Sequence, residues 1–307
     1  MTARALGLLL GWCADLLLAD PARHHPVAWF GSSAHRLEQR VWRDDARAGA
    51  AYAAVLVAGV VAPAVLVERR GGPVVRTLTT ATATWVALGG TSLDREAAAV
   101  QARLESADLA GARRQVARIV GRETAGLDEA GVARAAVESV AENTSDAVVG
   151  TLVWGAALGL PGLLGHRAAN TLDAMVGHRT VRHERFGWAA ARLDDLLGLP
   201  AARLTASLAV VLGEDPRAAA RAWRRDAGAH PSPNAGPVEA AFAGALGLSL
   251  GGPTTYGTRT EPRPRLGDGR APGPVDLARA RRLGRRVGAG ALVISVLLAA
   301  APRPARR

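Results

Sequence analysis

Uncharged and charged stretches alternate along this chain of 307 residues in a pattern typical of membrane proteins. Four uncharged runs approach the roughly 17–25 residues that a helix needs to cross a bilayer. They cover residues 50–67, 77–93, 147–165 and 287–302. Whether the 147–165 run crosses the bilayer or only enters it stays open, since Gly159, Pro161 and Gly162 are able to break it partway. We therefore expect an all-α, polytopic membrane protein with about four to five membrane helices. A soluble helical protein with buried core helices is the alternative.

The segments between these runs carry most of the charge. Residues 94–135 are amphipathic and predict a soluble helical insertion, with Ser106 as a candidate N-cap and a last helix from near Asp128 to Glu142. Residues 257–286 are rich in Arg, Pro and Gly, and predict a flexible loop. Asp15 interrupts the first apolar run, which favours a retained helix over a cleaved signal peptide. We expect residues 1–307 to form one domain.

Composition narrows the possible functions. The net charge is +11, and the sequence contains no lysine, so every basic side chain with a permanent charge is an arginine. A P-loop nucleotidase and a pyridoxal-phosphate enzyme both need a lysine, and both classes are excluded. The single cysteine, Cys13, cannot build a disulfide or a cysteine zinc cage. No nucleic-acid-binding motif accompanies the arginines, so contact with the lipid bilayer explains them better.

The first polar cluster begins at the mouth of the 147–165 run. Glu138, Glu142 and Asp146 are spaced i, i+4, i+8, so a continuous helix would align them in one stripe beside Asn143. Carboxylate oxygens suit Mg²⁺, especially when substrate phosphates complete the coordination, and Glu142 and Asp146 are the candidate ligands. A solvated helix end explains the same spacing equally well.

The second cluster follows the same run. Asn170 and Asp173 share a helix face, and Arg192, Asp194 and Asp195 come after an apolar stretch. The arginine that interrupts the next apolar segment, Arg203, needs a partner, for which Asp195 is one candidate. The alternative is a structural ion-pair network.

Two further clusters are shorter. The segment "HPSPNAGPVEAAFAGALG" contains His230, Ser232, Asn234 and Glu239, and "LADPARHHPV" contains Asp20 and His25. Asn143, Asn170 and Asn234 are the only asparagines in the chain, and each lies in a polar cluster. A residue that the composition disfavours is more often retained for function, although Asn234 also suits a helix N-cap.

Taken together, these clusters resemble the CobD/CbiB family, the adenosylcobinamide(-phosphate) synthases of cobalamin biosynthesis. The matching stretches are "ADP…HPV", "ESVAENTSD", "NTLDAMVGH", "RFGWAAARLDDLLGLPAARLTA" and "HPSPNAG…EAAFAGALG", in family order over residues 8–257. The chain departs from the family pattern in three places. Ala19 replaces a glycine, Pro237 comes one position early, and His178-Arg179 replaces a tyrosine-lysine pair.

The resemblance implies a multi-pass ligase of the bacterial cell membrane. It would use ATP and Mg²⁺ to join aminopropanol, or its phosphate, to the propionate carboxylate of adenosylcobyric acid, its corrinoid substrate. Other cobalamin-assembly enzymes are candidate partners. A carboxylate is a poor electrophile, so ATP must first convert it to an acyl phosphate, and the attacking amine must then lose a proton.

On this basis we assign two groups of residues. The catalytic group comprises Glu138, Glu142, Asn143, Asp146, Asn170 and Asp173. The substrate-binding group comprises Asp20, His25, Arg192, Asp194, Asp195, Arg203, His230, Ser232, Asn234 and Glu239. A non-catalytic membrane scaffold or corrinoid carrier is the alternative, and an ion-coupled transporter is a third possibility, for which no internal repeat is visible.

Overall fold

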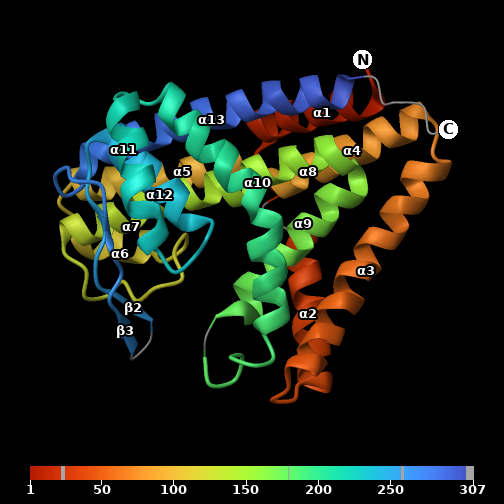
Figure 1. Ribbon diagram of the computed structural model, residues 1–307, viewed down its shortest axis with the longest axis horizontal. Coiled ribbons are helices and arrows are strands. Elements are labelled where there is room, and N and C mark those ends of the chain that lie inside the picture. The colour runs from red at the N-terminus through yellow and green to blue at the C-terminus, as the bar shows by residue number, and fades with distance from the viewer. Residues whose placement is uncertain (22–24, 179, 257–258, 302–307) are drawn as a thin grey trace. The chain divides into compact units, whose positions relative to one another are not determined.

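The computed structural model describes residues 1–21, 25–178, 180–256 and 259–301 (Figure 1). The chain forms two compact units, and each unit is assembled from segments that are distant in sequence. Unit 1 contains Met1–Gly89, Asp146–Pro200 and Ala291–Arg307, whereas unit 2 contains Gly90–Ser145 and Ala201–Gly290.

Unit 1 is built from helices. It contains α1 (Ala3–Leu18), α2 (Pro26–Val41), α3 (Ala46–Arg70), α4 (Pro73–Leu88), α8 (Gly150–Leu158), α9 (Leu160–Leu172) and the first half of α10 (Trp188–Leu212). Two π-helical segments interrupt this part of the chain, η1 (Thr144–Val149), which begins at the unit boundary, and η2 (Asp173–Gly177).

Unit 2 is also mainly helical. Its helices are α5 (Gly90–Glu105), α6 (Leu109–Val116), α7 (Glu129–Asn143), the second half of α10, α11 (Pro216–Asp226), the 3-10 turn η3 (Ala227–Ala229), α12 (Ala235–Leu246) and most of α13 (Pro274–Ala300). Four short strands pair as β1 (Leu250–Gly251) with β4 (Arg265–Leu266), and β2 (Thr254–Tyr256) with β3 (Arg259–Glu261), both antiparallel. The all-α expectation is confirmed.

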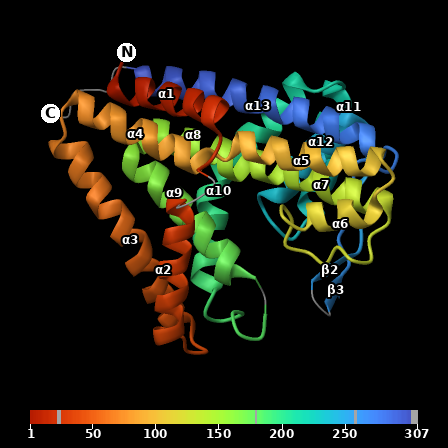
Figure 2. The ribbon, with the colours of Figure 1, turned by 180° about the vertical axis from the view of Figure 1, so that it is seen from behind.

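Small residues set the packing of α1 in unit 1. Helices α1 and α4 lie side by side, with α8 against both (Figures 1 and 2). A Cβ atom on Gly11 would lie 2.4 Å from the Cβ atom of Thr84, so only glycine allows this approach. Gly7, one turn earlier, meets Thr80 in the same way. Small residues four apart are a common means of bringing helices together in membranes.

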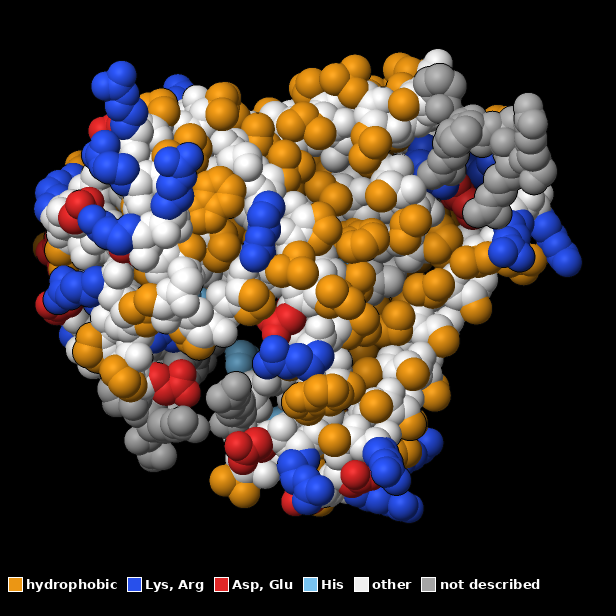
Figure 3. All heavy atoms as spheres, in the orientation of Figure 1, with side chains coloured by type: hydrophobic (Ala, Val, Ile, Leu, Met, Phe, Trp, Pro, Cys, Tyr) orange, Lys and Arg blue, Asp and Glu red, His pale blue; other side chains and the backbone are white. Residues whose placement is uncertain are grey.

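Within the described residues, three helices are long and apolar enough to cross a membrane, namely α3, α10 and α13. Hydrophobic side chains gather on the surface over α3 (Figure 3), and only 17% of its most apolar window is buried. The 50–67 and 287–302 runs fall in α3 and α13 as expected. The span in α10 was missed because its charged first turns hide the apolar stretch that follows.

The 147–165 run is not one membrane helix. It begins inside η1 and is then divided between α8 and α9 at Gly159, whose φ of +73° ends the first helix. Pro161 then starts the second helix, where a missing backbone N–H has no cost. The 77–93 run becomes α4, which has 16 residues and ends at Leu88.

The polar segments follow the sequence prediction in part. The last helix expected in the 94–135 insertion is confirmed as α7, with Asp128 as its N-cap. Ser106 is not a cap; Asp108 caps α6 instead, because its carboxylate accepts the Gly111 N–H at 2.8 Å. Helix α13 begins at Pro274, inside the segment for which the sequence predicts a flexible loop.

Candidate functional site

The predicted site residues fall into two groups, one within each unit. The aspartate cluster of unit 1 comprises Asp20, Asp146, Asp173, Asp194 and Asp195 with Arg167, Asn170 and Arg192. The glutamate cluster of unit 2 comprises Glu138, Glu142 and Glu239 with Arg122, His230 and Arg263.

Two π-helical segments determine where the aspartates of unit 1 point. The expected stripe of Glu138, Glu142 and Asp146 requires a regular α-helix through all three, but α7 ends at Asn143 and η1 follows. A π turn adds one residue to the helical turn and changes the face of the residues after it. Glu142 consequently faces Glu239, whereas Asp146 faces Arg167. Asp173 opens the second π-helical segment, η2.

Arg167 is the centre of the aspartate cluster. The charges of Asp20, Asp146 and Asp194 face its guanidinium group. Its Nη1 donates a hydrogen bond to Asn170 Oδ1 at 3.2 Å, and its Nε is buried without a partner among the described residues. A buried guanidinium group surrounded by three carboxylates is held in place by their charge.

Asn170 connects Arg167 to the remaining aspartates. Its side chain is hydrogen-bonded to Asp194, which lies near Asp173 and Asp195. Burial raises the pKa of Asp173, and the nearby Asp195 raises it further, against the opposing effect of His178 and Arg192. Among the described residues, the cluster thus gathers five carboxyl groups around the guanidinium groups of Arg167 and Arg192.

Arg192 pairs with Asp195 rather than with a distant group. The two residues are three positions apart on α10, and the Arg192 Nη1 and Asp195 Oδ2 atoms are 2.9 Å apart. Asp195 was one candidate partner for Arg203, but Arg203 Nη1 donates to the Pro233 carbonyl at 2.7 Å and to Asn234 Oδ1 at 3.2 Å. That hydrogen bonding places Arg203 with the other polar residues of unit 2.

An apolar core fixes the backbone around Asp173. Leu172 and Val176 are fully buried against Phe186 and Tyr52 of unit 1. The two aromatic rings have centroids 5.1 Å apart and an interplanar angle of 44°. Because the residues on both sides of Asp173 are locked into this core, its carboxyl group has little freedom to move away from the cluster.

Asp20 and His25 lie on the loop between α1 and α2. Asp20 Oδ1 is buried and has no hydrogen-bond partner among the described residues. His25 caps α2 through Nδ1, which accepts the Val27 N–H at 3.2 Å. Burial lowers the pKa of His25, and Asp20 opposes this effect. Residues 22–24 of the predicted loop motif and Arg179 of the departing dipeptide lie outside the described residues.

An apolar cavity of about 500 Å³ adjoins the aspartate cluster. Side chains from α2, α3, α4 and α9 line it, including Phe30, Val60, Leu78 and Leu164. Arg167 is the one charged residue in this lining. The cavity thus combines a large apolar surface with a single cationic group, an arrangement typical of small-molecule sites.

The glutamate cluster is built on the two most buried helices of unit 2. Residues of α7 and α12 are buried on nearly every side, which is typical of a helix at the centre of a core. Glu138, which is 2% exposed, accepts from Arg122 Nη1 at 2.5 Å and from the Gly251 N–H at 2.7 Å. A buried carboxylate with two such donors is fully satisfied.

Glu142 and Glu239 form a carboxyl pair that holds a proton. Burial raises the pKa of Glu239 well above its usual value, and the charges of Glu142 and Glu138 raise it further, against the opposing effect of Arg122. Glu239 is hydrogen-bonded to Glu142, which is possible only if one of the two is protonated. The pair is therefore able to donate or accept a proton.

His230 is neutral in this arrangement. Burial lowers its pKa, and the charge of Arg263 lowers it further. Arg263 Nη1 lies 2.9 Å from His230 Nε2, and a guanidinium group can only donate, so Nε2 is the unprotonated nitrogen. Nδ1 lies 3.0 Å from the backbone N of Ser232 and 3.3 Å from its carbonyl oxygen. The 3.7 Å approach of Nε2 to Glu239 Oε1 is therefore not an ion pair.

The remaining predicted residues of unit 2 organise the backbone around this cluster. Asn143 Nδ2 donates to the carbonyl of Ser139 at 2.9 Å. Ser232 Oγ accepts the backbone N–H groups of Asn234 and Ala235 at the start of α12. Asn234 occupies the N-cap position of α12 but makes no side-chain cap, because its Oδ1 accepts from Arg203.

The aspartate cluster fits a divalent cation better than the glutamate cluster does. Within the described residues, no three His, Cys, Asp or Glu side chains form a ready-made metal cage. Mg²⁺ does not need one, since it usually keeps several waters and completes its shell with substrate phosphates. The neighbouring carboxylates and the partnerless oxygen of Asp20 suit such an ion, whereas Glu138 already has two donors.

Sequence reasoning missed the three arginines that organise the clusters, Arg122, Arg167 and Arg263. Arg167 had a recognisable signal, because it directly follows a long uncharged run, where an arginine is costly unless it is paired. Arg122 and Arg263 lie in polar segments that contain other arginines, and nothing in the sequence distinguishes them from those neighbours.

Comparison with known proteins gives consistent matches over nearly the full chain. A family model described as "CobD/Cbib protein" matches residues 8–284. Cobalamin biosynthesis protein CobD of Mycobacterium tuberculosis is 52% identical over 305 residues, which cover 98% of this chain and 97% of that protein. The proteins of the same name from Rhodobacter capsulatus and Rhizobium meliloti are 44% and 39% identical, over 97% and 88% of this chain and 96% and 88% of theirs. No solved structure matches the chain.

Proposed function

Because the chain belongs to the CobD/CbiB family of cobalamin biosynthesis proteins, we propose that it is an ATP-dependent ligase that forms an amide bond. Its substrates are adenosylcobyric acid and aminopropanol, or the phosphate of aminopropanol, and its product is adenosylcobinamide or its phosphate. The observation that carries the proposal is the aspartate cluster, where five carboxyl groups gather with Arg167, Asn170 and Arg192 beside an apolar cavity.

The reaction requires two steps with different electrostatic demands. The propionate oxygen first takes the terminal phosphoryl group of ATP, which releases ADP and leaves an acyl phosphate. The amine nitrogen then attacks the carbonyl carbon, the bond from carbon to the phosphate oxygen breaks, and inorganic phosphate leaves. One proton must be removed from the attacking nitrogen, which is work for a carboxylate base.

The carboxyl groups of the aspartate cluster suit the cationic participants. Asp194 and Asp173 are the groups we assign to the ammonium group of aminopropanol, with Asn170 orienting Asp194 by their hydrogen bond. Asp20 and Asp146, on either side of Arg167, are the groups we assign to Mg²⁺. When bound, Mg²⁺ would neutralise charge on the transferred phosphoryl group.

The cavity beside Arg167 suits the apolar part of the corrinoid. Thr82, an exposed residue in its lining, offers a test of this assignment. We expect Thr82→Leu to raise the KM for adenosylcobyric acid at least threefold while leaving the KM for ATP unchanged. An equal change in both KM values would contradict the assignment.

The central test is a ligase assay on the purified full-length protein, which follows ADP release and product formation together. We expect Asp146→Asn and Asn170→Ala to lower turnover about 100-fold or more, because each removes a group that orients charge at the reacting atoms. Asp44→Asn is the matched control, since Asp44 is exposed in unit 1 and lies 3.6 Å from Arg185.

Near wild-type turnover by folded Asp146→Asn and Asn170→Ala proteins would overturn the site assignment. Corrinoid binding without ADP release, in the presence of aminopropanol and ATP, would instead favour a carrier or scaffold. The two outcomes are distinguishable because the assay measures ADP and the amide product separately.

A further inference from the structure

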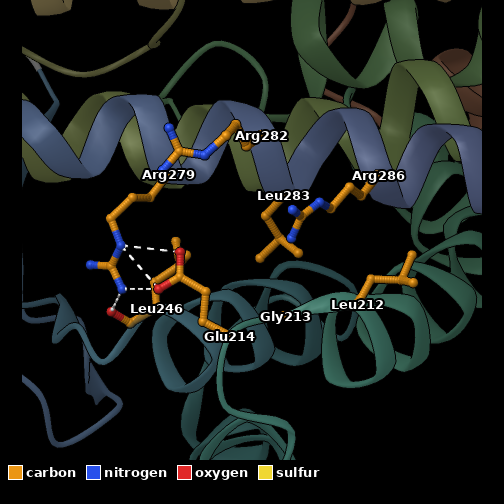
Figure 4. Close-up of a pocket in the computed structure, with 8 residues that line it drawn as sticks. All are labelled: Leu212, Gly213, Glu214, Leu246, Arg279, Arg282, Leu283 and Arg286. Atoms are coloured by element: carbon orange, nitrogen blue, oxygen red, sulfur yellow. Dashed lines mark hydrogen bonds and ion pairs between the residues drawn. The ribbon is translucent and has the colours of Figure 1, made fainter.

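One face of α13 carries arginines that the two clusters do not use. Arg279, Arg282 and Arg286 are spaced i, i+3, i+7, so they project from the same side of the helix. Together with Glu214 and the side chains of Leu212 and Leu283, they line a pocket of about 230 Å³ within unit 2 (Figure 4). We refer to it as the arginine pocket.

The positive charge of the arginine pocket is only partly balanced. Arg279 binds Glu214 through Nη2 at 2.5 Å and Asp276 through Nη1 at 2.7 Å. Arg282 and Arg286 form no ion pair within 4.0 Å in the part of the chain that the structure describes, and both are exposed. Figure 4 shows Arg286 beside Leu283, and the side chain of Arg282 nearer to Arg279. Three guanidinium groups therefore meet one carboxylate in the lining.

Two other arginines of α13, Arg281 and Arg285, form ion pairs with a carboxylate of unit 2. Arg281 Nη2 and Arg285 Nη1 both bind Asp94 of α5, at 2.7 Å and 2.6 Å. Those two arginines share a structural partner inside unit 2, so an ion pair accounts for them without a ligand. Arg282 and Arg286 form no such ion pair among the described residues. They share the charge of Glu214 with Arg279, so the guanidinium groups of the lining outnumber its carboxylate and favour an additional anion.

The surroundings of the pocket indicate the kind of anion. Leu212 and Leu283 provide apolar contacts beside the arginines. From Val287 to Ala300, the same helix contains no charged residue, and α13 is one of the helices able to cross a membrane. The arginine pocket thus lies where a candidate membrane helix changes from charged to apolar, the level at which phosphate headgroups of lipids are found.

We propose that the arginine pocket binds a phosphate group, supplied by the headgroup of an anionic phospholipid or by a soluble phosphate compound. Arg282 and Arg286 bind the phosphate oxygens by charge-assisted hydrogen bonds, which arginine forms readily with phosphate. The leucines contact the apolar part of a lipid. This site is separate from both clusters, and it does not depend on the proposed ligase activity.

The test uses the full-length protein in a neutral, non-ionic detergent, with binding measured by microscale thermophoresis. The probes are short-chain phosphatidylglycerol, short-chain phosphatidylcholine and inorganic phosphate. We expect Arg282→Gln/Arg286→Gln to weaken binding of phosphatidylglycerol at least tenfold. The matched control is Arg217→Gln/Arg224→Gln, which removes two exposed arginines from α11 of the same unit and should change binding less than twofold.

A gain-of-binding variant guards against a folding artefact. Glu214 competes with the ligand for Arg279, so Glu214→Gln should tighten binding of phosphatidylglycerol severalfold. Tighter binding cannot result from a misfolded pocket. If the same variant pattern appears with inorganic phosphate at similar affinity, the site is supported and its source is a soluble phosphate compound. The proposal is overturned if the wild-type protein binds neither phosphatidylglycerol nor inorganic phosphate. It is also overturned if Arg282→Gln/Arg286→Gln binds them as tightly as the wild-type protein does.

Discussion

The two clusters surround their acidic groups with different partners. In the glutamate cluster, Glu138 has an arginine and a backbone N–H, and Glu142 and Glu239 share a proton. In the aspartate cluster, five carboxyl groups gather around Arg167 and Arg192, and Asp20 Oδ1 has no hydrogen-bond partner among the described residues. We therefore expect the first cluster to be structural and the second to bind a cation.

This difference separates stability from ligand binding. Removing a group from a balanced cluster leaves its partner buried and unpaired, which costs stability. Neutralising one member of a group of neighbouring carboxylates relieves repulsion and costs little or nothing. The variants below test the comparison, from the largest expected effect on stability to the smallest.

Arg167→Met should be the most destabilising change, with a loss of about 3–5 kcal/mol, because it leaves three carboxylates facing one another without their cation. Thermal unfolding in detergent would measure it. Arg192→Gln is the control, since Arg192 is 53% exposed and its pair with Asp195 should contribute less than about 1 kcal/mol. Equal losses for the two variants would show that Arg167 is not the organising cation.

The Arg122–Glu138 pair should show a coupling energy of about 1–3 kcal/mol in a double-mutant cycle. Arg122→Met and Glu138→Gln are the single changes, and each leaves the other member of the pair without its partner. The double variant should destabilise the protein by less than the sum of the two single changes, because it leaves no member of the pair unpaired. Chemical denaturation of the purified protein gives the three free energies. Strict additivity would mean that the 2.5 Å contact does not hold unit 2 together.

Glu239 should make stability depend on pH. Its pKa is raised in the folded protein, so the folded state keeps a proton that the unfolded chain loses above its usual pKa of 4.5. Wild-type stability should consequently fall as the pH rises from about 4.5 through the raised pKa, by up to about 1.4 kcal/mol per pH unit. Glu239→Gln, which imitates the protonated acid, should lack this slope. Glu105→Gln, an exposed change in the same unit, should retain it.

Asp20→Asn should have the smallest effect on stability, within about 0.5 kcal/mol of wild type, because Asp20 Oδ1 has no hydrogen-bond partner among the described residues. The same change should weaken the rise in Tm that Mg²⁺ causes in the wild-type protein. Measuring Tm with and without MgCl₂ separates the two effects. A loss of stability comparable to that of Arg167→Met would place Asp20 among the structural groups.

Much of the fold followed from apolar patterning, and the exceptions have physical causes. Helices α3 and α7 and the apolar end of α13 lie where runs and caps predicted them, whereas the first half of α13 replaces a predicted loop. The 147–165 run failed as one helix because Gly159 and Pro161 stop and restart it, and α10 was missed because charged side chains occupy its first turns. Periodicity does not report a backbone break inside an apolar run or a charge that a neighbouring segment neutralises.

The candidate site was predictable as a set of residues but not as an arrangement. Nothing in the spacing of Glu142 and Asp146 shows that they belong to different clusters, because that depends on a π turn between them. The positions of Arg122 and Arg263 depend on contacts with Glu138 and His230 that are distant in sequence. The functions assigned to these residues stay predictions until the ligase assay is done.

The π-helical segments η1 and η2 also bear on how the chain tolerates insertions and deletions. Each residue turns an α-helix by about 100°, so a π turn is equivalent to one residue inserted without forming a loop. Deleting one residue from 144–149 would restore an ordinary α-helix and point the side chain of Asp146 in another direction. A one-residue gap at η1 or η2 in a related sequence therefore marks a rotated carboxylate and a changed specificity, where the same gap in a surface loop would be neutral.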